Sequence, residues 1–246
     1  MEFTPVSIII LLIAFWWSAF VRAGLGFGGA GLMYPIAFLV VDSVLFIVPI
    51  VGMHLLFFSG ITLAKGGYKK VDWSVATKLI LIILPAKLVG VFGLLQMSDF
   101  WLLMSVYSIL IVYSFGYIFN YQPPKPNPWL NVPILLLGGY VAGLNLAGAP
   151  IIAAVALQYL NKENARESMY VVWIVLVSLK LLTLVAFNVD MQLQHQLWLL
   201  PIACVGHIMG SRFHKKLQSM QNENFYRWMG GALLALSLIG LGRHFI

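Results

Sequence analysis

Long runs of apolar residues with few polar interruptions dominate the chain. Six of these runs are long enough to cross a bilayer as helices, because a crossing takes about 17–25 predominantly apolar residues. They cover residues 44–63, 75–95, 99–119, 168–187, 195–211 and 226–242. Two further regions, 4–41 and 130–160, are apolar but interrupted near the middle. The pattern predicts an all-α polytopic membrane protein.

The basic residues between the runs indicate how the chain threads through the membrane. They lie in four connections: Lys65, Lys69 and Lys70; Lys125; Lys162 and Arg166; and Arg212, Lys215, Lys216 and Arg227. The remaining connections hold Asp42, Asp99 and Asp190 and no Lys or Arg. Lys and Arg accumulate in cytoplasmic loops. One path of the chain through the cell (inner) membrane places all four basic connections in the cytoplasm, and this path leaves both termini outside.

This threading makes each interrupted region a hairpin, since both of its ends must lie on the same side of the membrane. Each hairpin is followed by three spans, and the two sets run in opposite orientations. The sequence therefore predicts two inverted repeats, residues 1–120 and 130–246, joined by a cytoplasmic linker at 121–129. Each repeat is a glycine-broken helical hairpin followed by three transmembrane helices, and the hairpins are either re-entrant or fully spanning.

The tips of the two hairpins resemble each other. Gly24–Ala30 aligns with Gly143–Ala149 at an offset of 119, with four of the seven positions identical. Glycines this dense oppose a regular helix, because each costs about 1 kcal/mol relative to Ala. In secondary transporters, broken helices near the midplane direct their N-termini at anionic substrates. The alternative is close helix packing through small residues. The candidate substrate-binding residues at the tips are Gly28, Gly29, Asn145 and Gly148.

Three stretches of the chain resemble a known family. They are Gly24-Leu-Gly-Phe-Gly-Gly-Ala-Gly-Leu-Met-Tyr-Pro35, its weaker echo Gly143-Leu-Asn-Leu-Ala-Gly-Ala-Pro150, and Lys69-Lys-Val-Asp-Trp73. Together they are similar to the TauE/SafE sulfite and organosulfonate exporter family, and the likeness covers essentially the whole chain in layout. The resemblance implies an integral membrane permease for small sulfur-containing or organic anions. The second tip departs from the family pattern by having Asn145 and Ala147 in place of glycine.

Four cationic side chains lie at membrane depth, where each costs about 2.5–3.5 kcal/mol to insert. Lys78 is close to the cytoplasmic end of its span and is expected to snorkel, which leaves three candidate site residues. Arg22 directly precedes the first tip, and its guanidinium suits a carboxylate, sulfonate or sulfite. Lys87 and Lys180 lie within spans that hold no Asp or Glu to pair with them. An anionic substrate is therefore the expected partner, and the alternative is snorkelling of the side chains toward the headgroups.

Two histidines within the spans are candidates for proton coupling. His54 is central in its span and His207 lies well inside another, and histidine titrates near physiological pH. The alternative is that each is a hydrogen-bonded packing residue. A proton is thus a candidate coupling ion beside the anionic substrate.

The composition narrows the function further. The 246 residues are 61% hydrophobic and only 9% charged, about a third of the charged fraction of a soluble domain, and the mean hydropathy is +0.92. This composition excludes a soluble enzyme. The net charge of +7 comes mainly from basic residues in the short loops that set the membrane topology, so no nucleic acid is expected as a partner. No cofactor, metal site or enzymatic activity is expected.

The sequence predicts a secondary transporter, an exporter of anions such as sulfite or organosulfonates by alternating access around a central cationic site. The alternatives are a passive anion channel and a non-transporting assembly protein.

Overall fold

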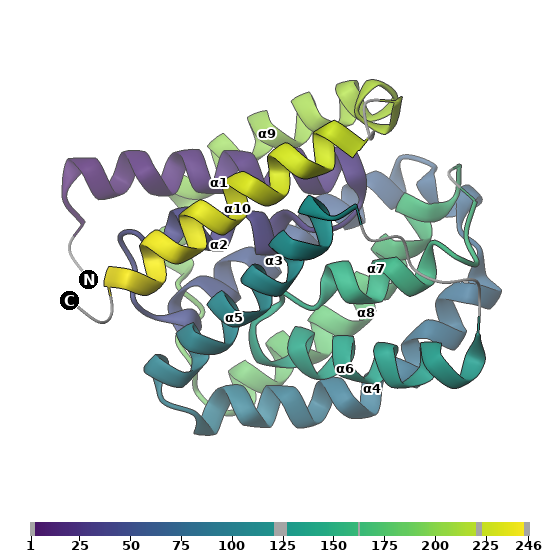
Figure 1. The fold of residues 1–246 in the computed structure, drawn as a ribbon, viewed down its shortest axis with the longest axis horizontal. Helices are drawn as coiled ribbons and strands as arrows, with labels where there is room; N and C mark the ends of the chain where they lie inside the picture. Colours follow the sequence, from purple (N-terminus) through teal and green to yellow (C-terminus); the bar gives the residue numbers. More distant parts are fainter. Residues whose placement is uncertain (1–2, 121–126, 162, 220–222, 244–246) are drawn as a thin grey trace. The chain divides into compact units, whose positions relative to one another are not determined.

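A computed structural model describes residues 3–120, 127–161, 163–219 and 223–243 of the chain. The described residues form ten α-helices, one short 3-10 turn, η1 (Gly67–Lys70), and no strand. Among them, five helices are long and apolar enough to cross a membrane: α1 (Pro5–Leu25), α3 (Val44–Ala64), α4 (Trp73–Gln96), α5 (Asp99–Ile118) and α8 (Ala165–Ala186). The other helices are α2 (Gly29–Ala37), α6 (Pro128–Asn145), α7 (Ala149–Ala156), α9 (Leu193–Ser219) and α10 (Glu223–Arg243) (Figure 1). The all-α class expected from the sequence is confirmed.

The helices follow the apolar runs, with differences at their ends. Helix α9 continues to Ser219, well past the expected end at residue 211, because helical hydrogen bonding does not require apolar side chains. The predicted linker falls mainly on residues 121–126, which lie outside the described residues, and α6 already begins at Pro128.

Each interrupted region consists of a longer helix, a sharp turn and a short return helix. The longer helices begin in the same way, with a polar N-cap followed by proline. The Thr4 hydroxyl accepts the Ser7 N–H at 3.2 Å, and the Asn127 side-chain oxygen accepts the Trp129 N–H at 3.1 Å. Such caps satisfy backbone donors that have no partner inside the helix, and proline at the first position has no N–H to satisfy.

The two tips begin their turns in the same register but end them differently, since Gly28 before α2 is left-handed (φ 80°) and Gly148 before α7 is right-handed (φ −68°). Helix α1 ends at Leu25 and α6 at Asn145, and the next residues, Gly26 (φ 88°) and Leu146 (φ 64°), are both left-handed. These positions lie 120 apart in the chain, as do the starts of the return helices α2 and α7. The offset of 119 expected from the sequence is therefore wrong by one residue at these turns. The reason is that Leu146 takes the left-handed position that Gly26 takes in the first tip. The two residues are not identical, so an alignment based on identical residues does not match them.

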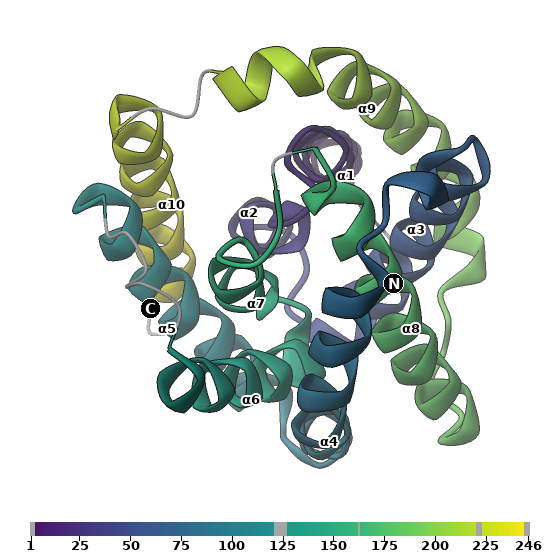
Figure 2. The ribbon, with the colours of Figure 1, turned by 90° about the vertical axis from the view of Figure 1, so that its right-hand side faces the viewer.

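The chain folds into two compact units, each assembled from separate segments of the sequence. The first unit comprises Met1–Val44, Ser98–Gln122 and Leu197–Ile246, and so contains α1, α2, α5, α10 and most of α9. Within it α5 and α10 pack along each other, as Figure 2 shows. Helix α9 crosses α1 closely, because a Cβ on Gly206 or Gly210 would overlap the backbone of α1.

The second unit comprises Leu45–Met97 and Pro123–Gln196, and so contains α3, α4, η1, α6, α7 and α8. Within it α4 packs along α6 and also contacts α8. Helix α3 packs on α8, where Gly52 leaves room for the side chains of Val177 and Leu181. Both predicted lysines and the second tip thus belong to one compact unit.

Candidate functional site

Two buried lysines converge on the end of α6. Lys87 comes from α4 and Lys180 from α8, and their side chains are 2% and 0% exposed. The ammonium group of Lys180 donates to the Gly143 carbonyl at 2.6 Å and to the Ala142 carbonyl at 3.4 Å. Lys87 donates to the same Ala142 oxygen at 3.5 Å. Two cations from different helices therefore share one backbone acceptor next to the second tip.

Glycines at the crossing of α4 and α6 make this convergence possible. A Cβ on Gly143 would overlap the backbone carbonyl of Lys87, and one on Gly90 would overlap that of Tyr140. Small residues let membrane helices approach to backbone contact. The close crossing brings the backbone of Lys87 against the last turn of α6, and so brings its side chain within reach of that turn.

The lysines face the negative end of a helix dipole. The last carbonyls of α6 carry about half an elementary charge, and basic side chains commonly satisfy such carbonyls. Neither lysine pairs with a carboxylate within the part of the chain that the structure describes. Two lysine side chains therefore converge on one helix end, whose partial negative charge suits basic groups.

The second tip continues directly from this cluster. Asn145 is fully buried, and its side-chain oxygen accepts the Ala147 N–H at 2.9 Å, which fixes the turn. A Cβ on Gly148 would overlap the Gly138 carbonyl and the Ala142 N–H, so this glycine lets α7 pack against α6. Asn145 and Gly148 thus build the frame that holds the carbonyls facing the lysines.

The first tip holds the remaining tip candidates, in the first unit. Arg22 lies in the last turn of α1 and is 4% exposed. Gly28 has φ +80° with open space around a hypothetical Cβ, so glycine is needed there for its backbone conformation. Gly29 is needed for packing, because its Cβ would overlap the Ser18 carbonyl. Arg22, Gly28 and Gly29 therefore lie together at one tip.

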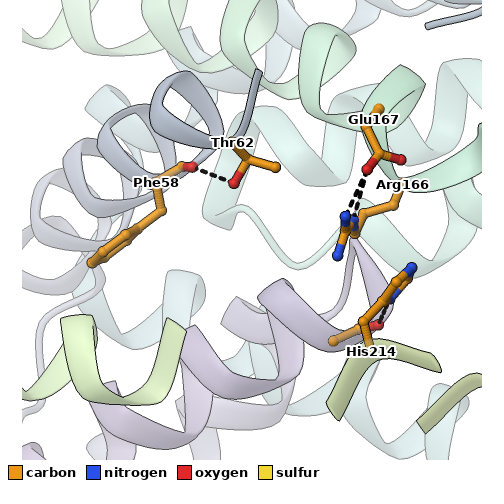
Figure 3. Close-up of polar contacts among 6 residues, drawn as sticks. Phe58, Thr62, Arg166, Glu167 and His214 are labelled. Carbon is orange, nitrogen blue, oxygen red and sulfur yellow. Dashed lines mark hydrogen bonds and ion pairs between the residues drawn. The ribbon is translucent and has the colours of Figure 1, made fainter. Parts of the chain in front are cut away.

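A further basic side chain reaches the end of α1. The His214 ring, from α9, forms a hydrogen bond with the carbonyl oxygen of Gly24 (Figure 3). The carbonyls at the ends of both α1 and α6 therefore bind basic groups from another helix of their own unit. The sequence analysis missed His214, because it lies beyond the apolar run and resembles an ordinary loop residue.

The two coupling candidates belong to different units. His54, on α3, is 3% exposed and packs edge-on against Phe58, with ring centroids 6.3 Å apart. His207, on α9, is partly buried and directly follows Gly206, one of the glycines that contact α1. Each therefore lies on a helix that packs against another helix of the protein.

Polar contacts at the helix ends complete the second unit. Glu167, buried in the first turn of α8, forms an ion pair with Arg166 at 2.6 Å. The Thr62 hydroxyl donates back to the Phe58 carbonyl of its own helix at 2.9 Å (Figure 3), a bond common for hydroxyls in membrane helices. Arg166 and Glu167 thus bind each other, and Thr62 binds its own helix. All three residues lie apart from Lys87 and Lys180 along the chain.

The structure thus brings some of the predicted residues together and leaves others as predictions. Lys87 and Lys180 meet beside Asn145 and Gly148 in the second unit, while Arg22 belongs to the first. The carbonyls of Ala142 and Gly143, which the sequence analysis did not identify, are the direct partners of the lysines. One signal for this arrangement was present in the sequence, the spacing of Gly139 and Gly143, which is typical of close helix crossings.

Similarity to known proteins covers nearly the whole chain. The family model described as "Sulfite exporter TauE/SafE" matches residues 10–241 of the 246. No curated protein and no solved structure matches significantly. The helices described above are those of a multi-pass membrane protein. The chain therefore belongs to the TauE/SafE sulfite exporter family, a family of membrane transporters.

Proposed function

We propose that this protein exports a small sulfur-containing or organic anion, such as sulfite or an organosulfonate, and binds it at the lysine cluster of the second unit. The observation that carries the proposal is the convergence of Lys87 and Lys180 on the last turn of α6. Cations buried in membrane helices are expensive and mark substrate pathways. Membership of a family described as sulfite exporters supports export as the direction and a small sulfur-containing anion as the cargo.

Alternating access of two inverted repeats is the proposed mechanism. The structural support is the common register of the two tips and a reciprocal pattern of helix contacts. Helix α6 packs on α4 through Gly90, and α1 packs on α9 through Gly210. Gly90 and Gly210 are again 120 positions apart, so each hairpin contacts the corresponding span of the opposite repeat. A two-fold relation between the repeats requires such reciprocal pairs.

The first tip is proposed to complete the substrate path. Arg22 supplies a third cation, and Gly28 and Gly29 keep the backbone accessible at the start of α2. His54 and His207 are the proposed carriers of a coupling proton, because they lie well inside the expected spans and histidine titrates near physiological pH. The proposed location is the inner cell membrane, with the basic loops in the cytoplasm and both termini outside.

Flux measurements in proteoliposomes test the proposal. Lys87→Gln and Lys180→Gln each remove one cation while keeping a polar side chain, and Lys78→Gln makes the same change at an exposed position on α4. We expect sulfite or sulfonate flux to fall at least about 10-fold in the first two variants, the effect of about 1.4 kcal/mol. Lys78→Gln should transport like the unaltered protein.

Normal flux in both Lys87→Gln and Lys180→Gln would refute the lysine cluster as the binding site. Absence of anion flux in the unaltered protein, reconstituted in either orientation, would refute anion transport itself. Counterflow of labelled anion driven by unlabelled anion is expected of a carrier, and a passive channel would not show it.

A further inference from the structure

The connection between α3 and α4 lies where three apolar helices of the second unit have an end. Helix α3 ends at Ala64, α4 begins at Trp73, and η1 lies between them. Helix α8 begins at Ala165 and contacts η1. All three helices are long and apolar enough to cross a membrane. Because one end of each meets the same short turn, this turn lies at a membrane surface, at the depth of the lipid headgroups.

The backbone of this connection is fixed by contacts with α3 and α8. The Ser168 hydroxyl accepts the backbone N–H of Asp72 at 2.9 Å, and the Asp72 side chain accepts the Val75 N–H at 3.0 Å. A Cβ on Gly67 would overlap the Thr62 carbonyl, so the turn lies directly against the last part of α3. These contacts hold the turn in place without using its lysine side chains.

The exposed side chains of the connection are basic and aromatic. Lys65, Lys69 and Lys70 are exposed, and so are Tyr68 and Trp73, at 51% and 56%. The ammonium nitrogen of Lys69 lies 6.0 Å from the centre of the Tyr68 ring. Rings that carry a polar O–H or N–H collect at the boundary between membrane and water. We refer to these five residues as the basic turn.

The lysines of the basic turn are not bound by carboxylates of the protein. Within the part of the chain that the structure describes, none of the three forms an ion pair. Glu167 packs against Gly67, but its carboxylate binds Arg166. The Asp72 side chain is engaged as the cap of α4. An ammonium group has three donors and no acceptor, so the lysines keep donors for an anionic group from outside the protein.

We propose that the basic turn binds the headgroup of an anionic phospholipid. The phosphate diester of such a lipid accepts hydrogen bonds from the lysines, and its negative charge attracts them. Tyr68 and Trp73 suit the boundary between the headgroup and the acyl chains. A membrane presents this ligand at the depth of the turn, next to three membrane-crossing helices. This inference does not depend on which anion the protein transports.

Native mass spectrometry of the full chain in neutral detergent tests the proposal. Dioleoylphosphatidylglycerol is the anionic probe, and dioleoylphosphatidylcholine is the probe without net charge. We expect the unaltered protein to bind the anionic lipid at least about 10-fold more tightly. Lys69→Gln with Lys70→Gln should lower the affinity for phosphatidylglycerol at least about 10-fold, because two lysines no longer face the headgroup. Binding of phosphatidylcholine should stay the same, and Lys69→Arg with Lys70→Arg should keep the preference.

Arg212→Gln with Lys216→Gln is the matched control, since it removes the same charge from two exposed positions near the end of α9. We expect this variant to keep its affinity for phosphatidylglycerol. Equal losses in the two glutamine variants would overturn a local site, because net charge alone would then explain the binding. Displacement of the lipid by millimolar inorganic phosphate would also overturn the proposal, since a soluble anion would then be the ligand. The two lipids are compared within each variant, so a general loss of stability does not mimic the expected result.

Discussion

A lysine buried in a membrane helix requires a partner, and the partners of Lys87 and Lys180 are backbone carbonyls rather than carboxylates. Such acceptors carry partial charges, so they orient the ammonium groups without neutralising them. A carboxylate in their place would form a closed ion pair with little remaining attraction for a ligand. The choice of acceptor is therefore consistent with the proposed binding of an anion at the cluster.

At the same scale, Asn145 allows a test of the local charge without loss of the turn. Asn145→Asp keeps the oxygen that accepts the Ala147 N–H but adds a negative charge two residues from the carbonyl bound by Lys180. We expect anion affinity to fall at least about 10-fold because the new carboxylate competes for the lysines. Isothermal titration with sulfoacetate measures the change.

Asn127→Asp is the matched control for this substitution. Asn127 also accepts an N–H two residues ahead, that of Trp129, at the opposite end of the same helix. An aspartate there keeps the cap, and it lies far along α6 from the lysines. Equal affinity losses in the two variants would contradict a local effect at the cluster.

At the scale of elements, the crossing of α4 and α6 determines whether the cluster forms. Gly143→Ala places a Cβ against the Lys87 carbonyl, and overpacking of this kind costs about 1–3 kcal/mol. We expect a lower melting temperature in detergent together with reduced anion flux, because the helices must separate. Intrinsic tryptophan fluorescence during heating measures the first effect.

Gly60→Ala, in α3, is the control for the alanine change. Nothing lies within contact distance of a Cβ at Gly60, and alanine favours a helix over glycine by about 1 kcal/mol. The control should therefore keep or raise the melting temperature. An equal melting temperature in Gly143→Ala would show that the crossing tolerates a methyl group.

The elements also show how far the sequence could predict this structure. Apolar runs predicted the helices and glycine density predicted the breaks, because both depend on local chain properties. The exact register of the tips was missed, since a leucine adopts the left-handed conformation at Leu146. The acceptors of the lysines were missed because backbone carbonyls are present in every residue. Only the tertiary crossing of α4 and α6 selects Ala142 and Gly143.

At the scale of the whole molecule, the threading of the chain decides whether the two repeats are inverted. Thr4 and Asn127 are equivalent in structure, because each caps the first helix of a hairpin and precedes a proline. Inverted repeats would place them on opposite sides of the membrane, whereas parallel repeats would place them on the same side.

Single cysteines at these two positions distinguish the arrangements. With Cys204→Ser as the background, we expect Thr4→Cys to react with an impermeant maleimide from outside intact spheroplasts. Asn127→Cys should react only after the membrane is opened, since it follows the basic linker that the positive-inside rule assigns to the cytoplasm. Each substitution removes a helix N-cap that contributes about 1 kcal/mol to stability. The two variants should therefore lose similar stability, and a difference in their labelling does not arise from unfolding of one of them. Labelling of both cysteines from the same side would refute inversion, and a carrier of this family would then need another way to expose the lysine cluster to each side in turn.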